Sequence, residues 1–361
     1  RVQKASTSAQ SQFFYRTDYL EKVNKKAPTT PDELYDVLKA IKDAGLTQGS
    51  APFFPYPNAG HMNNQAEGFL FPAFGEAIDA FFADDGTGKV VYNKTSDQYR
   101  RYLEFMAKLY ADGLFEPEYF TMDVDTWTAR LKEGKVAFST NMASLMPENF
   151  EDGVAHIDHL APLTSEFTTK QQTRAYDYVT SSGGTISSKT KYAEEIIRMF
   201  DCFFAKEQLH PDYKFGAMTC IYGVQGECWD FAENEDGSKL FKIFLPDDWK
   251  ESQWVYSTLH NAWGQHFGTV LLDTVSGAPG TNPYAREMGM LKNNIPYAVT
   301  TFPDTKMKYT AEESSAMTQK QTDITSYVDQ MRAKFITGVE PLTDASWDAY
   351  VNEINKMGID E

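Results

Sequence analysis

Hydrophobic positions near the start of the chain change from a compact run to a helical spacing. The run Phe13–Tyr15 is typical of a short strand, and a first helical segment follows it through Leu20. Thr30 is placed to cap a second helix, with Pro31 in its first turn and Glu33 completing a capping box. The apolar stripe of this helix consists of Leu34, Val37, Leu38 and Ile41. We therefore expect a strand, a short helix and a well-capped surface helix.

The same patterns predict the main elements of the remaining chain. Amphipathic helices are expected over residues 67–82, 96–113, 123–134, 190–206, 310–335 and 347–357. Strands are expected over residues 90–92 and 136–138 and from Tyr176 onward. The helix over 310–335, which Thr310 caps with Glu313 in the box position, is expected to break before Asp323. The last helix is expected to dock on the body of the protein through Trp347, Tyr350 and Ile354.

Charge and composition limit the possible partners. The formal net charge is −17, which argues against nucleic acid and anionic membranes because both require clustered lysine and arginine. Aromatic residues make up 14% of the 361 residues, a share that fits either a large aromatic core or a cleft in which sugars stack. The length fits two domains or lobes. No apolar run approaches the ~20 residues that cross a bilayer.

No arrangement typical of catalysis or metal binding stands out. The sequence has no nucleophile elbow, HExxH motif, Walker loop or dinucleotide-binding glycine motif. Glu227, beside Trp229, is the one acid whose surroundings suit glycoside hydrolysis. His156 and His159 lack a third ligand nearby, and the acidic turn 84–89 lacks the spacing of a calcium loop. We therefore expect no catalytic residue, metal or cofactor.

The three cysteines form no CxxC pair. Cys202 is expected to be a small buried apolar residue, whereas Cys220 and Cys228 either pair across a loop or stay free.

Candidate ligand contacts lie where loops and strand ends combine aromatic and polar residues. Tyr56 belongs to a loop rich in proline, asparagine and aromatic residues, which is either a binding loop or a proline-stiffened surface loop. Asn141, with Thr140 as second choice, follows the strand expected over 136–138. Small polar residues at the carboxyl end of a strand commonly contact ligands in open α/β sheets.

Aromatic residues farther along supply the other candidates. Tyr176 and Tyr178 fall on one face of a strand that precedes a Gly-Gly pair, which either lets the backbone flex or forms an ordinary turn. Trp254 and Trp263 lie among glutamine, asparagine and histidine residues. This combination suits stacking on the apolar face of a sugar while polar neighbours bind its hydroxyls.

Five segments of the chain carry sequence motifs that occur in the same order in a known family. They are Arg16-x-Asp18 with PTTPDEL at 28–34, LYADGLFEPE at 109–118, KEGKVAFS at 132–139, YGVQGECWD at 222–230 and the terminal helices at 331–358. In this order they resemble the extracellular solute-binding proteins of family 1, the sugar-binding lipoproteins of Gram-positive ABC importers. Tyr222 and Trp229, in the fourth segment, join the candidate ligand contacts. Gln225 departs from the family, which usually carries an acid at this position.

The resemblance implies an α/β fold of the type II periplasmic-binding-protein architecture, helix-rich, with two lobes joined by hinge segments. One nearly complete lobe is expected over residues 17–175. Residues 1–16 and 176–290 are expected to form the rest of the other lobe with the hinge, and residues 291–361 a helical segment packed on the lobes. In the family a signal, a lipid-anchored cysteine and the first βα units precede this point, so we also expect an N-terminal portion to be lacking.

The resemblance also implies a function. It points to a non-enzymatic substrate-binding component that captures an oligosaccharide in an aromatic cleft between lobes and delivers it to an ABC permease. The protein is then expected to be a monomer, anchored outside the cytoplasm by an N-terminal lipid. Two alternatives stay open: a carbohydrate-active hydrolase that uses the same cleft, and a binding protein for peptides or another polar nutrient. Cleaved product would indicate the first, and a charged clamp for ligand termini the second.

Overall fold

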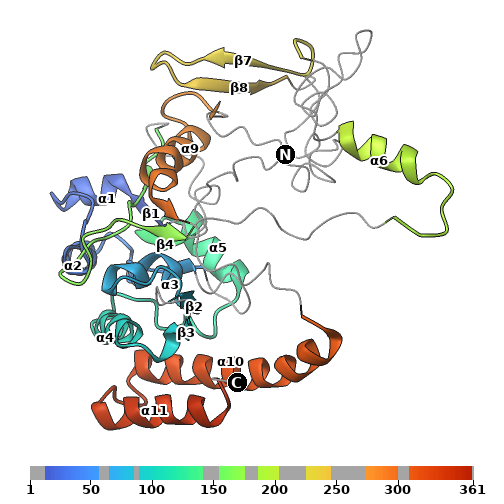
Figure 1. Cartoon of the computed structure of the whole chain (residues 1–361). Coiled ribbons are helices and arrows are strands. Elements are labelled where there is room, and N and C mark those ends of the chain that lie inside the picture. Colours follow the sequence, from blue (N-terminus) through green and yellow to red (C-terminus); the bar gives the residue numbers. More distant parts are fainter. Residues whose placement is uncertain are drawn as a thin grey trace. The chain divides into compact units, whose positions relative to one another are not determined.

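The computed structural model describes residues 13–56, 65–84, 89–140, 154–174, 186–202, 225–244, 274–275, 277–299 and 309–359. Figure 1 shows the elements along the chain, which divides into two compact units by its contacts. Unit 1 comprises Arg1–Ser6 and Tyr178–Glu287, and unit 2 comprises Thr7–Asp177 and Met288–Glu361.

Unit 2 combines helices with short strands. Its helices are α1 (Thr17–Lys22), α2 (Pro31–Asp43), α3 (Gln65–Leu70), α4 (Asp97–Ala111), α5 (Val124–Lys132), α10 (Ala311–Thr337) and α11 (Asp344–Lys356). Its strands are β1 (Phe13–Arg16), β2 (Phe82–Asp84), β3 (Val90–Tyr92), β4 (Phe138–Thr140), β5 (Ile157–His159), β6 (Thr173–Arg174) and β10 (Ala298–Val299). Single 3-10 turns lie at η1 (Phe71–Phe74), η2 (Asn93–Thr95) and η5 (Ile295–Tyr297).

Unit 1 is described through a hairpin and two helices. Its elements are α6 (Ala193–Cys202), β7 (Trp229–Glu233), β8 (Lys239–Ile243) and β9 (Thr274–Val275), and α9 (Asn282–Asn293) begins in unit 1 and ends in unit 2. β7 and β8 are antiparallel, and β9 adds to β8 in parallel. Gly237, at φ +81°, lies in the turn between β7 and β8.

Strand β1 is the centre of the unit 2 sheet. It pairs antiparallel with β4 on one side and with β5 on the other, so that Phe13 lies opposite Thr140 and Phe14 opposite His159. Phe53 forms parallel bridges to Phe138 and to Phe115, which extends the sheet beyond β4. The ends of β4 and of the extended segment around Phe53 therefore point the same way, as the strands of an open α/β sheet do.

The core of unit 2 is built around the aromatic rings of β1. All four residues of β1 are buried, which confirms the strand expected there. The Phe13 ring stacks on Phe69 with 4.7 Å between centroids and lies tilted against Phe53 at 5.1 Å. The stripe predicted for α2 is buried against this core. Each such large apolar side chain contributes about 1.5–3 kcal/mol when fully buried.

Four of the predicted helix starts are confirmed, at Thr30, Ser96, Asp123 and Thr310. At each of them the side chain accepts a backbone N–H three residues ahead. The capping box is complete at α10, where Glu313 accepts from the N–H of Thr310. At α2 it differs from the prediction, because Glu33 Oε2 accepts from the N–H and the hydroxyl of Thr29, both at 2.7 Å, and not from Thr30.

The single helix predicted over 67–82 is wrong. Helix α3 ends at Leu70, the turn η1 follows, and Phe82 lies in β2, which pairs with β3. Pro72 lacks the N–H that a helix needs at that point. Gly75 passes so close to Gln98 that a Cβ would lie 2.4 Å from its Oε1. The chain must therefore turn here against α4.

Two other element boundaries differ from the predictions. Strand β4 starts at Phe138 and not at Val136, because the N–H groups of Ala137 and Phe138 both donate to Pro52 O and interrupt a regular ladder.

Helix α10 is unbroken, so the predicted interruption before Asp323 is wrong. The Asp323 carboxylate accepts from the Gln319 side chain one turn earlier, at 3.0 Å to each oxygen. The last helix is confirmed, although α11 begins at Asp344, before Trp347.

A buried cluster of charges joins α3, η2, α4 and α10. Glu67 and Lys94 form an ion pair in which both side chains are 2% exposed. Tyr99 OH donates to the other Glu67 oxygen at 3.2 Å, and Arg332 Nη1 lies 3.7 Å from it. Burial by itself would raise the pKa of Glu67, but the charges of Lys94 and Arg332 outweigh it and hold that pKa below its usual range. The carboxylate therefore stays ionised between two cations.

Helix α11 closes the same cluster from outside. Tyr350 donates from its hydroxyl to the carbonyl of Lys94 at 3.1 Å. Its ring stacks on Tyr327 of α10 at 5.9 Å and lies 5.1 Å from Trp347. The docking predicted for Trp347, Tyr350 and Ile354 is confirmed, since all three are buried.

Removing Lys94 should be far more costly than removing a surface lysine. In Lys94→Met, Glu67 loses its closest cation while it stays buried, and we expect a loss of about 3–5 kcal/mol of unfolding free energy. The matched control is Lys39→Met, because Lys39 pairs with Asp43 at 3.2 Å with its side chain 54% exposed. The control should change stability by less than about 1 kcal/mol. Urea denaturation followed by circular dichroism measures both, and equal effects would contradict the buried pair.

The Arg16–Asp18 pair predicts a pH dependence of stability. Arg16 donates to both Asp18 oxygens at 2.7 Å. Burial alone would raise the pKa of Asp18, but the hydrogen bonds and charge of Arg16, with Lys22, lower it below its usual range. Such a group stabilises the fold above its unfolded pKa of about 3.9, and this contribution is lost as pH falls through the lower folded pKa.

We therefore expect Asp18→Asn to be less stable than the wild type at pH 6 and the difference to shrink below about pH 4. The urea midpoint between pH 2 and pH 6 measures this. The control Asp36→Asn changes an exposed carboxylate of α2 and should stay within about 0.5 kcal/mol of the wild type. A deficit in Asp18→Asn that is constant across this range would argue against the depressed pKa.

Candidate functional site

The extended segment Phe53–Tyr56 and the end of β4 form the candidate site in unit 2. Phe54 N–H donates to Phe138 O at 2.9 Å, and Tyr56 N–H donates to Thr140 Oγ1 at 3.0 Å. Thr140 is fully buried, so its hydroxyl is a fixed acceptor for the backbone of Tyr56. These bonds hold the end of the segment Phe53–Tyr56 against the end of β4, at the edge where an open α/β sheet usually binds ligand.

Helix α5 supports the Tyr56 ring. Trp127 meets it edge to face, with 4.8 Å between centroids and 84° between planes. Trp127 is fully buried, and its Nε1 donates to Phe54 O at 3.3 Å. Ser139 Oγ donates to the same carbonyl at 2.7 Å. Tyr56 itself is only half-buried, so a rigidly supported aromatic side chain remains accessible in part.

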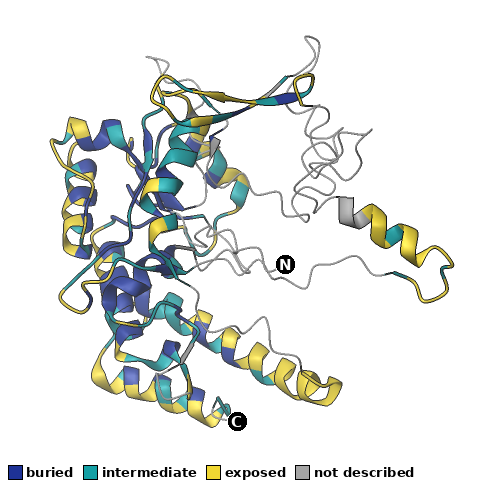
Figure 2. Cartoon of the chain, turned by 45° about the horizontal axis from the view of Figure 1, so that its top comes forward, coloured by how far each residue is buried: buried dark blue, intermediate teal, exposed yellow. Residues whose placement is uncertain are grey.

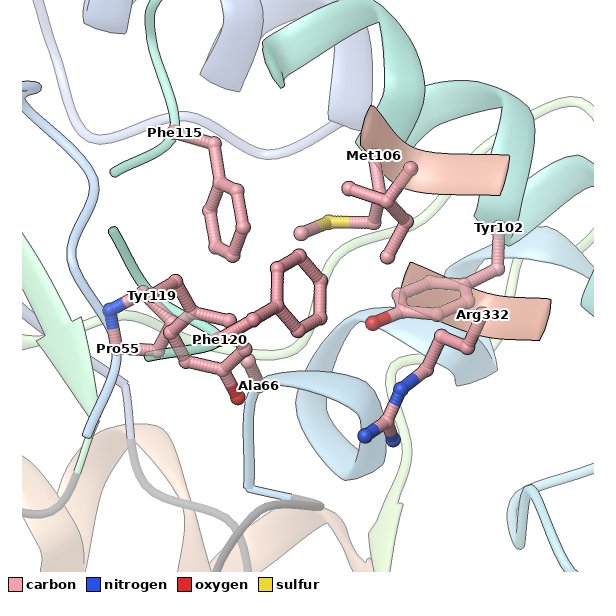
Figure 3. A pocket seen from close by; sticks show the side chains of 9 residues that line it. Pro55, Ala66, Tyr102, Met106, Phe115, Tyr119, Phe120 and Arg332 are labelled. Carbon is pink, nitrogen blue, oxygen red and sulfur yellow. The ribbon is translucent and has the colours of Figure 1, made fainter. Parts of the chain in front are cut away.

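A small cavity lies on the other side of the same segment (Figure 3). Its lining is mostly aromatic and includes one cation: Pro55, Ala66, Tyr102, Met106, Phe115, Tyr119, Phe120, Arg332 and Ile336. The volume is about 10 Å³, which is the space of one water molecule. It is too small for a sugar ring, so this cavity belongs to the support of the site and not to ligand binding.

A larger groove lies beside the start of the same segment. It has a volume of about 460 Å³ and is lined by residues 48–51, residues 116–118, Arg130 and Lys135. Arg130 lies 2.9 Å from Glu116 and donates to Glu118 at 2.7 Å. Burial would lower the pKa of Arg130, but these carboxylates raise it. The groove has a suitable size for a small ligand, but it has no aromatic lining residue and its arginine is already paired.

Of the predicted ligand contacts, Tyr56 and Trp229 are described. Tyr56 lies at the site above, while Trp229 is on β7 of unit 1. Trp229 is 4% exposed and packs against Phe231 and Phe241, at 5.5 and 5.6 Å between centroids. The candidates that lie outside the described residues are Asn141, Tyr176, Tyr178, Tyr222, Trp254 and Trp263. Contact with ligand stays a prediction for all eight.

The supporting role of Trp127 could not be predicted from the sequence. Its position on an expected amphipathic helix indicated only core packing, and nothing in the pattern showed that the helix would cross the segment that carries Tyr56. Thr140, the second choice beside Asn141, is the last residue of β4 and accepts the Tyr56 N–H, and its contact with ligand stays a prediction.

The described residues contain no group of three histidine, cysteine or acidic side chains placed to hold a metal ion. His159 lies buried in β5 with its Nδ1 2.5 Å from Asn294 Oδ1. Cys228 is a free thiol, and Cys220, its possible partner, lies outside the described residues. Among the helices that the structure describes, none has the length and apolar character to span a membrane.

Comparison with known proteins supports this view of the fold. Residues 5–145 match the family model of the bacterial extracellular solute-binding proteins. The fructooligosaccharide ABC transporter substrate-binding protein FusA of Streptococcus pneumoniae serotype 4 is 24% identical over 358 residues, which cover 95% of this chain and 62% of FusA. The chain thus spans less than two thirds of that relative.

Two solved structures are similar over nearly the whole chain. FusA of Streptococcus pneumoniae in complex with kestose has a TM-score of 0.63 at 19% identity, covering 98% of this chain and 70% of that one. An HMO-binding, ABC-transporter-associated solute-binding protein from Bifidobacterium longum infantis has a TM-score of 0.67 at 15% identity, covering 98% and 72%. The fold is therefore the type II periplasmic-binding-protein architecture, α/β with mixed sheets, as predicted. The resemblance to extracellular solute-binding proteins is confirmed by the family match.

The geometry predicts that the Thr140 hydroxyl holds Tyr56 in place. Thr140→Val keeps the side-chain shape but removes the acceptor of the Tyr56 N–H, and we expect a loss of about 1–3 kcal/mol of unfolding free energy. Thr121→Val is the matched control, because its hydroxyl bond to Glu118 O at 3.2 Å is exposed. Urea denaturation measures both variants. If Thr140→Val were no more costly than the control, the bond would not constrain the segment.

Proposed function

We propose that this protein is the substrate-binding component of an ABC importer and captures an oligosaccharide. Tyr56, held by Thr140 and supported by Trp127, is proposed as a stacking platform for one sugar ring. An aromatic ring that is held in place by its neighbours keeps a fixed orientation. Its accessible part can then stack on the apolar face of a pyranose or furanose. The observation that carries this proposal is the half-buried Tyr56 ring at the carboxyl end of β4, a place where this fold class binds ligand.

The names of the similar proteins support the choice of a sugar as ligand. FusA is named for fructooligosaccharides and has been solved with kestose, and the Bifidobacterium protein is described as HMO-binding. Both are named as components of ABC transport. From this similarity we propose that the protein delivers its sugar to permease subunits. We also propose that it acts outside the cytoplasm, held at the membrane by an N-terminal lipid anchor, and that it is a monomer.

In the proposed function the protein binds its sugar without cleaving it. The similar proteins are named as transport proteins. Glu227, the acid considered for hydrolysis, is exposed in the turn before β7. A glycosidase needs a second carboxyl group about 5–10 Å away across the bond that is cleaved.

We also propose that units 1 and 2 correspond to the two expected lobes. The aromatic candidates Tyr176, Tyr178, Tyr222, Trp254 and Trp263 remain the proposed contacts from the second half of the chain.

Truncating Tyr56 should weaken sugar binding. With kestose, stachyose and a human milk tetrasaccharide as probes, isothermal calorimetry on Tyr56→Ala should show a Kd about tenfold above the wild type, because an aromatic contact adds about 0.5–1.5 kcal/mol beyond area burial. Tyr56→Phe keeps the ring and should bind within about threefold of the wild type if stacking dominates. Chromatography of each mixture should return intact sugar.

Tyr309→Ala is the matched control, since it removes an exposed tyrosine just before α10. It should leave the Kd unchanged. Equal binding by Tyr56→Ala and the wild type would remove Tyr56 from the site, and cleaved sugar would favour the hydrolase.

A further inference from the structure

Arg332 is a buried cation that lines the same cavity as Pro55, the residue before Tyr56. It lies on α10, and its side chain is 10% exposed. Its guanidinium has Asp329 at 3.2 Å on its own helix and Glu67 of α3 at 3.7 Å. Burial would lower the pKa of Arg332, but Glu67, Tyr99 and Asp329 raise it above its usual range. Arg332 is therefore a permanent charge inside the protein.

Arg332 and Pro55 also line the same cavity (Figure 3). Pro55 directly precedes Tyr56, and Ala66 directly precedes Glu67, so the cavity wall contains neighbours of both the candidate ring and the buried carboxylate. With a volume of about 10 Å³, the cavity leaves almost no slack between these groups. A displacement of the Arg332 side chain is therefore expected to disturb the residues around the cavity, Pro55 and Ala66 among them.

Helix α10 does not depend on Arg332 alone for its position. Its apolar residues Ile324, Val328, Phe335 and Ile336 are buried in the core of unit 2. Tyr327 and Phe335 contact Tyr350 of α11 at 5.9 and 5.7 Å between centroids. The helix therefore provides a fixed base from which Arg332 extends toward α3 and Pro55.

We propose that Arg332 is a positioning residue for Tyr56. It fixes the start of α3 through Glu67 and fills the space behind Pro55, which holds the segment Phe53–Tyr56 against β4. Nothing in this role requires Arg332 to touch ligand. The inference rests on the proposed function only in so far as Tyr56 meets a sugar.

The first test is independent of any sugar. Hydrogen exchange measured by mass spectrometry should show roughly tenfold faster exchange in Arg332→Met over peptides 51–56 and 65–70, since both lose the group that fixes them. Peptides of α2, which lies outside the charge cluster, should exchange at the wild-type rate. The control Lys334→Met removes a cation from the same helix two residues away and should leave all these peptides unchanged.

The second test asks whether Arg332 acts through Tyr56. In calorimetric titrations with kestose, Arg332→Met should weaken binding about three- to tenfold in the wild-type background and less than twofold in Tyr56→Ala. Such non-additivity is the mark of two residues that act as one unit. Equal effects in both backgrounds would show that Arg332 affects binding by another route and would overturn the proposal.

Other outcomes also decide the matter. Uniformly faster exchange across unit 2, α2 included, would make Arg332 a general stabiliser and overturn the positioning role. If Arg332→Met fails to fold, Arg332→Lys replaces it, because lysine keeps a cation beside Glu67 but lacks the planar fork. If the wild type binds none of the sugars, the proposed function fails, and the exchange experiment alone decides the role of Arg332.

Discussion

A carboxylate buried between two cations loses its water, and the protein must replace that water with fixed partners. Glu67 obtains them from three places, namely Lys94 in the turn before α4, Tyr99 within α4, and Arg332 on α10. Because a buried ion left alone costs several kcal/mol, these elements stabilise one another. The C-terminal helices thus belong to the unit 2 core. The candidate site lies directly against this part of the core, since Pro55 and Arg332 line one cavity.

Local signals in the sequence predicted most helix starts, because a cap is settled within four residues. Thr30, Ser96, Asp123 and Thr310 illustrate this, as does the strand at Phe13. The error after Pro72 arose where a distant partner decides, because the chain there follows the surface of α4. The error at Asp323 has a local origin: both oxygens of its carboxylate accept from the Gln319 side chain one turn earlier, and α10 continues through this turn.

The candidate site was predicted in part for the same reason. Tyr56 and Thr140 were chosen from loop composition and from the position after a strand, both of which are local properties. Trp127 and Arg332 support the site from helices that approach in three dimensions, and each looked like an ordinary helix residue in sequence. Glu67 and Lys94 are 27 residues apart, and no periodic pattern marks them as a pair. Residues that support a site are therefore harder to find than residues that line it.

Helix α10 has two unlike halves, and the difference has a practical use. From Ala311 to Asp323 nearly every residue is exposed, while the second half is packed into the core (Figure 2). Met317 is 40% exposed on the first half. In a variant whose three cysteines are replaced by serine, a thiol introduced there would accept a dye or a surface linker without disturbing the packed half. The protein could then be immobilised through a rigid rod that is continuous with its own core, which would keep every attached molecule in the same orientation.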